Sequence, residues 1–209
     1  MIGKPAHLRD DQDSRPEVHT WSPFNPEESF PRCLTAKVLG LEVTTSPPST
    51  LAGRVTDETA RRVITAIGIP ERIGGYLTFT DFSDGPTLIS DEVQDPNSSL
   101  RREAGDFIFL GSGAGILVLN GQSGEVASWN DGTLRTISSA LDKFVEFMVL
   151  IQEKLNSAEE ESWPTGGAET RQASNDLMRR FREIDSEVMK PARAFWRSVV
   201  MGSFRSMGF

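Results

Sequence analysis

Four short apolar segments between residues 107 and 137 constrain the fold of this chain more than any other feature of its sequence. They cover residues 107–110, 116–119, 126–129 and 134–137. GSGAG, NGQSGE and NDG separate them, and glycine- and asparagine-rich connections of this length are typical of β-hairpin turns. The spacing therefore predicts a meander of three or four antiparallel strands.

Segments with a helical period lie on both sides of these strands. Helices are predicted over residues 56–67, 139–155, 175–184 and 192–200. We expect Thr56 to cap the first helix and Gly68 and Pro70 to stop it, while Pro191 is expected to open the last one. The glycine- and proline-containing residues 158–172 are expected to form a loop. The order of helix, strands and helices predicts an α+β fold.

The N-terminal fifth of the chain differs from the rest. Residues 1–50 contain seven of the twelve prolines and show no helical period, so we expect an irregular arm with a short strand near residues 35–43. Residues 51–209 are expected to form the α+β domain, with a further strand over residues 76–82.

The connection over residues 81–105 is strongly acidic and is interrupted by Gly-Pro and Asp-Pro-Asn. Its acidic side chains between positions 81 and 95 are Asp81, Asp84, Asp91, Glu92 and Asp95. Such a segment is compatible with a solvated loop, with a partner-binding patch, or with carboxylate pairs for acid–base or metal chemistry. No stretch has the spacing of a calcium-binding loop, and the first two interpretations are favoured.

Charge and rare residues exclude several functions. With 22 Lys and Arg against 30 Asp and Glu, the net charge of −8 argues against direct binding of nucleic acid. Cys33 is the single cysteine, and the two histidines, His7 and His19, both lie in the arm, so neither a metal site nor a cofactor is expected. No apolar run approaches the ~20 residues of a membrane span, and we expect a cytoplasmic protein.

Sequence motifs for catalysis are weak. The glycines of GSGAG precede an apolar strand segment where a phosphate-binding loop would precede a helix, so we interpret them as a hairpin turn. No G-x-S-x-G elbow is present. Trp129, Trp163 and Trp196 are interpreted as packing residues and not as binding anchors.

A dispersed set of turn and apolar residues resembles a known family. The matching positions are Gly68, Ile69, Pro70, Leu110, Gly111, Ser123, Gly124, Glu125, Val126, Ser138, Ser139, Ala140, Leu141, Phe144, Ile184, Asp185 and Trp196. Their order along about residues 52 to 200 resembles the SUKH superfamily, specifically its fourth immunity-protein subfamily. The chain departs from the pattern in having Ala127-Ser128-Trp129 after the hairpin valine, and in its long arm.

The resemblance implies a curved, mostly antiparallel sheet flanked by helices, and a bacterial protein that is not an enzyme. It implies that the protein binds a cognate toxin and covers the toxin's active site. A toxin that acts on nucleic acid, such as a nuclease or deaminase, needs a basic cleft, so the five acidic residues of the 81–105 connection are the predicted contacts.

Two alternatives stay open. One is a non-enzymatic adaptor or ligand-binding regulatory module with the same fold, because fold does not determine function. The other is an enzyme acting on a small molecule, which would need a pocket with perturbed ionisable groups. A toxin gene in the neighbouring reading frame would favour immunity.

Overall fold

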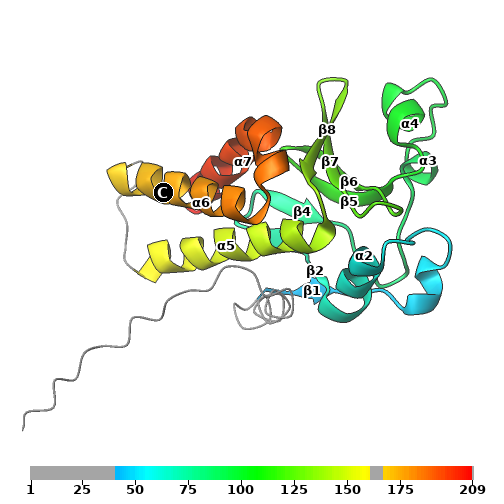
Figure 1. Ribbon diagram of the computed structural model, residues 1–209, viewed down its shortest axis with the longest axis horizontal. Helices are drawn as coiled ribbons and strands as arrows, with labels where there is room; N and C mark the ends of the chain where they lie inside the picture. Colours follow the sequence, from blue (N-terminus) through cyan, green and yellow to red (C-terminus); the bar gives the residue numbers. More distant parts are fainter. Residues whose placement is uncertain (1–40, 161–166, 209) are drawn as a thin grey trace, which may run out of the picture.

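The computed structural model describes residues 41–160 and 167–208, and its centre is a six-stranded antiparallel sheet (Figure 1). Each strand pairs with its neighbour in sequence. The strands are β3 (Arg72–Ile73), β4 (Leu77–Phe79), β5 (Ile108–Gly113), β6 (Gly115–Leu119), β7 (Val126–Asn130) and β8 (Thr133–Ser138). The predicted meander and the α+β class are thereby confirmed, and the meander extends to two further short strands.

The GSGAG sequence forms the tight turn between β5 and β6. Gly113 pairs with Gly115, and Ile116 continues directly as strand. Gly111 lies where β4 and β5 approach most closely, because a Cβ there would be 2.2 Å from the backbone oxygen of Thr78. Only glycine admits this approach of two backbones.

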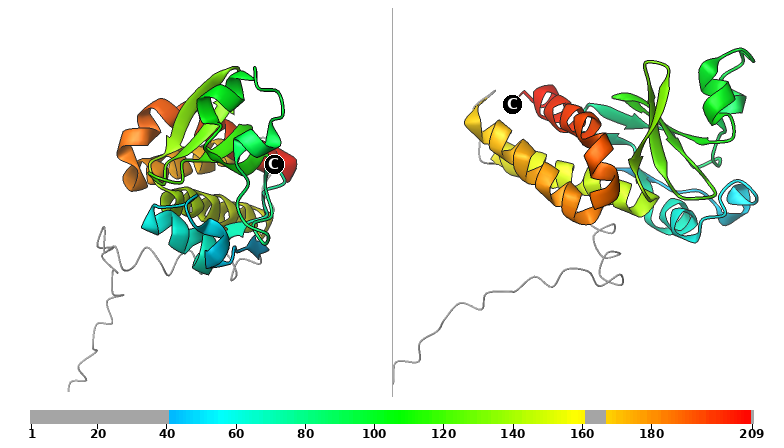
Figure 2. Two further views of the ribbon diagram at one scale, coloured as in Figure 1. Left: turned by 90° about the vertical axis from the view of Figure 1, so that its right-hand side faces the viewer. Right: turned by 45° about the horizontal axis from the view of Figure 1, so that its top comes forward.

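Helices cover one face of the sheet, which we call the inner face (Figures 1 and 2). They are α5 (Leu141–Glu160), α6 (Ala168–Ile184), α7 (Ser186–Ser206), α2 (Glu58–Arg62) and the π-helical turn η2 (Val63–Ile67). Their apolar stripes meet inward-facing strand residues such as Leu110 and Leu117 in the main core. Phe144, Phe147 and Trp196 form its aromatic centre, with ring centroids 4.8 to 5.7 Å from Trp196.

A two-stranded sheet lies beside α2 (Figure 1). It pairs β1 (Val43–Thr44) with β2 (Ile69–Pro70), and the short 3₁₀ helix η1 (Pro48–Leu51) follows β1. Gly68 adopts φ +91° just before β2, as expected for a glycine that stops a helix. The predicted strand over residues 35–43 lies almost wholly outside the described residues.

Several helix boundaries differ from the predicted ones. Asp57, not Thr56, caps α2, since its Oδ1 accepts a hydrogen bond from the Ala60 N–H at 2.7 Å. α5 and α6 extend into the predicted 158–172 loop. Pro191 lies inside α7 and does not open it, because the helix begins at Ser186, five residues before the proline.

The largest difference between the sequence prediction and the structure lies in the connection over residues 81–105. This connection contains two short helices that the sequence did not predict. These are α3 (Ile89–Glu92) and α4 (Ser99–Ala104), which pack on the outer face of the sheet. Ile89, Leu100 and Ala104 are buried there against β6 and β7. Helices this short are stabilised by tertiary packing and lack a recognisable helical period.

Candidate functional site

The predicted partner-binding residues all lie on the connection between β4 and β5. Asp81 and Asp84 follow β4, Asp91 and Glu92 end α3, and Asp95 lies in the turn before α4. All five are exposed. The structure therefore places each of them in solvent, spread along one continuous segment.

Arginine side chains hold the backbone of this acidic segment. Arg101 donates to the carbonyl oxygens of Val93 and Gln94 at 2.8 and 3.2 Å, and its neighbour Arg102 donates to Asn97 at 3.1 Å. Arg54, which precedes β4 in the sequence, donates a hydrogen bond to the carbonyl oxygen of Pro86. Guanidinium groups are thus bound to backbone oxygens, where they fix the path of the chain.

These arginines neutralise little of the negative charge on the carboxylates of the segment. One ion pair joins Arg54 and Asp91 at 3.9 Å, and both side chains are about half exposed, which makes the pair weak. Asp81 accepts from the backbone N–H and hydroxyl of Ser83, and Asp95 accepts from the N–H of Asn97. Within residues 41–160 and 167–208, no Lys or Arg nitrogen lies within 4.0 Å of the carboxylates of Asp81, Asp84, Glu92 or Asp95.

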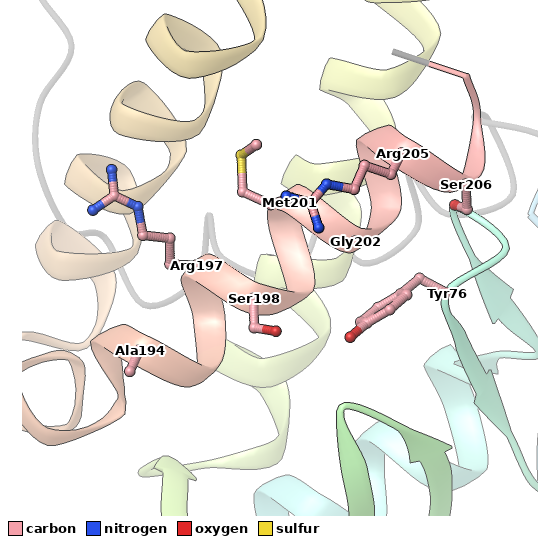
Figure 3. Close-up of a pocket in the computed structure, with 8 residues that line it drawn as sticks. All are labelled: Tyr76, Ala194, Arg197, Ser198, Met201, Gly202, Arg205 and Ser206. Carbon is pink, nitrogen blue, oxygen red and sulfur yellow. The ribbon is translucent and has the colours of Figure 1, made fainter. Parts of the chain in front are cut away.

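An open groove lies between α7 and the turn that joins β3 to β4 (Figure 3). It is lined by Tyr76, Ala194, Arg197, Ser198, Met201, Gly202, Arg205 and Ser206. Gly202 lets the Tyr76 ring lie against the helix, because a Cβ there would be 2.5 Å from the ring. The Tyr76 hydroxyl points toward Ser198. The lining offers hydroxyl and guanidinium groups and no carboxylate, imidazole or thiol, so it lacks a paired acid and base.

The described part of the chain holds no group of three or more His, Cys, Asp or Glu side chains placed to bind a metal ion. None of its helices is long and apolar enough to cross a membrane. Cys33, His7, His19 and Trp163 lie outside the described residues.

Asp185 lies between α6 and α7 and connects these helices to the start of α5. Its buried carboxylate accepts the backbone N–H of Ser139 at 2.7 Å, at the junction of β8 and α5, and lies 3.8 Å from the ammonium group of Lys143. From the next helix, the indole N–H of Trp196 donates to the carbonyl of Ile137 at 2.7 Å. These contacts fix α6 and α7 against the last strand.

The turn residues of the family pattern have similar structural roles. Gly124 has φ +77°, and a Cβ there would lie 2.7 Å from the Asp57 carboxylate that caps α2. The neighbouring Ser123 hydroxyl donates to Glu125 at 3.0 Å within the β6–β7 turn. The residues that resemble the family therefore build the scaffold, and the acidic segment is separate from them.

An antiparallel meander with helices on its inner face, joined by these buried and turn residues, has the architecture expected of the SUKH superfamily. The family model described as SUKH-4 immunity protein matches residues 14–201. The chain belongs to the SUKH-4 immunity protein family, and this membership indicates a toxin-neutralising immunity function. Searches of curated proteins and of solved structures found no match.

Proposed function

We propose that this protein binds a cognate toxin and covers the toxin's active site, and that it does so without catalysis. Its acidic segment provides the contacts. The contacting residues are Asp81, Asp84, Asp91, Glu92 and Asp95. The observation that carries the proposal is that these carboxylates are exposed and are mostly left without a cationic partner among the described residues, although three arginines lie on or beside the segment.

Such an arrangement favours binding to a basic surface. Uncompensated carboxylates repel one another weakly in the free protein, and a partner with Lys and Arg side chains relieves this repulsion while gaining hydrogen bonds. The arginine-held backbone reduces the entropy that is lost when the segment is immobilised in a complex. A toxin of the nuclease or deaminase type, with a basic cleft for nucleic acid, fits this surface.

Membership of the SUKH-4 immunity protein family supports a protein that acts by binding and obstruction. We place this activity in the cytoplasm of the toxin-producing cell, where a toxin would otherwise reach the cell's own nucleic acid.

The experiment compares two variants with the same change in net charge. In the first, the five acidic residues of the segment are converted to Asn or Gln. In the control, five exposed glutamates of the helical layer are converted to Gln: Glu159, Glu160, Glu169, Glu183 and Glu187. Binding to the toxin encoded in the adjacent reading frame, with its active site disabled, is measured at two salt concentrations, and host survival is scored with the active toxin.

We expect the segment variant to associate about tenfold or more slowly at low salt and to protect the host poorly, because steering by complementary charge acts mainly on the association rate. The control should behave like the wild-type protein. Equal affinity of the two variants for the toxin would show that the acidic segment is not the contact surface. Failure of the wild-type protein to bind or neutralise the toxin would remove the immunity function itself.

A further inference from the structure

The outer face of the sheet has an apolar surface that α3 and α4 cover incompletely. A small cluster at its centre buries Val118 of β6 and Ala127 of β7 beneath Ile89, Leu100 and Ala104. Partly exposed apolar side chains surround this cluster. They are Val93, Phe107, Phe109, Ile116, Trp129 and Leu134, and we call them the outer apolar face.

Strand register places three of these residues in one row across the sheet. Ile116 of β6 pairs with Trp129 of β7, which in turn pairs with Leu134 of β8. Val118 and Ala127 form the parallel row two residues away, beneath the short helices. Side chains two residues apart on a strand point to the same face, so the Trp129 row continues the buried cluster toward solvent.

Trp129 packs against the outer cluster, as the sequence predicts for a packing residue, and it also keeps solvent exposure. Trp196 is fully buried and hydrogen bonded, whereas Trp129 is only partly buried and no hydrogen bond from its indole N–H is found among the described residues. A contiguous set of large apolar side chains that keep solvent exposure is typical of protein interfaces, and tryptophan is the residue type most enriched at their energetic centres.

Charge at the border of the outer apolar face indicates what covers it. Val93 belongs to the face and directly follows Asp91 and Glu92, which are exposed. Glu92 has no cationic partner among the described residues, and Asp91 has only the weak pair with Arg54. At its α3 edge the outer apolar face therefore has an anionic border, which complements a partner that presents an apolar side chain among Lys and Arg residues.

We propose that the outer apolar face is the centre of the toxin interface, with Trp129 as its anchor and Asp91 and Glu92 on its rim. This inference rests on the proposed immunity function and extends it, since it assigns the stability of the complex to β6, β7 and β8. The acidic segment then accelerates association, and the apolar row slows dissociation.

The test truncates side chains of the Trp129 row to alanine and compares these variants with truncation of an apolar residue elsewhere on the surface. Trp129→Ala and Leu134→Ala are the test variants, and Met207→Ala is the control, because Met207 is 39% exposed at the end of α7. Association and dissociation rates with the disabled toxin of the adjacent reading frame are measured for each. Trp129→Ala should weaken binding about tenfold or more through faster dissociation, with the salt dependence unchanged.

Two further measurements separate a loss of folding from a loss of contact with the toxin. Thermal unfolding identifies a variant that has lost its fold, and hydrogen exchange of the wild-type complex then locates the interface without any substitution. Protection of residues 116–136 on binding supports the proposal. Toxin bound with no protection there, or equal dissociation rates for folded Trp129→Ala and Met207→Ala, overturns it while leaving the immunity function intact.

A second copy of the chain is the remaining occupant, and sedimentation of the free protein tests it. A wild-type dimer that Trp129→Ala dissociates would overturn the assignment of this face to a toxin. If the wild-type protein does not bind the toxin at all, the proposed function and this inference fail together.

Discussion

Replacing Asp185 tests whether one carboxylate holds the helical layer to the sheet. In Asp185→Ala the N–H of Ser139, a half-buried residue, loses its buried acceptor, which costs about 1 to 3 kcal/mol. The ammonium group of Lys143 also loses its partner, but this side chain keeps 32% exposure, so we add only about 1 kcal/mol for the ion pair. We expect a loss of about 3 kcal/mol in the free energy of unfolding.

The assay is urea unfolding followed by tryptophan fluorescence, since Trp196 is buried against the same strand. A chain of this size should also show a melting temperature lower by roughly 6 to 12 °C. Asp185→Asn keeps an oxygen acceptor for Ser139 and removes only the charge, so it should lose about 1 kcal/mol. Asp176→Asn breaks an exposed pair with Arg179 and should change stability by less than about 0.5 kcal/mol.

The reasoning about Asp185 is refuted by two results. If alanine and asparagine at this position destabilise equally, the hydrogen bond to the backbone is not the main contribution. If both cost less than about 1 kcal/mol, the carboxylate does not join the helical layer to β8.

Two further predictions concern the scaffold and the acidic segment. Gly111→Ala should cost about 3 kcal/mol or more by urea unfolding or prevent folding, because its Cβ would lie 2.2 Å from a backbone oxygen of β4, whereas Gly132→Ala, with nothing within 4 Å, should cost only about 1 kcal/mol. Arg101→Ala removes the donor to the carbonyls of Val93 and Gln94, so amide exchange of residues 91–98 should become faster and toxin affinity should fall although no acidic residue is changed; unchanged exchange in that segment would contradict the role given to this arginine.

Local sequence signals predicted the meander and the presence of the long helices, although α6 and α7 begin earlier than predicted. Glycine and asparagine at the hairpins, such as Gly113 and Gly115, determine turn geometry within a few residues, and the alternation of apolar side chains follows directly from strand geometry. The start of α2 was misplaced by one residue because Thr56 and Asp57 are both good caps, and the choice between them depends on which side chain reaches the Ala60 N–H.

The candidate site divides in the same way. That the segment is acidic and exposed could be read from its composition, and all five predicted residues are exposed. The binding of arginines to its carbonyl oxygens could not be predicted from the sequence, because Arg54 and Pro86 are brought together only by the fold. The partly exposed position of Trp129 was also hidden, since a tryptophan in a strand has the same sequence pattern on either face of a sheet.

The sequence by itself determined the strands of the meander, the presence of the long helices and the turns between the strands, since these depend on neighbouring residues, and its composition determined the excess of negative charge. The family followed from turn and apolar residues dispersed along the chain. Only the tertiary structure decided that α3 and α4 form on the outer face, that Asp185 joins α6 and α7 to the last strand, and that a row of apolar side chains stays partly open beside the acids. These features depend on burial and hydrogen bonds between residues far apart in the chain, and such contacts have no local signal.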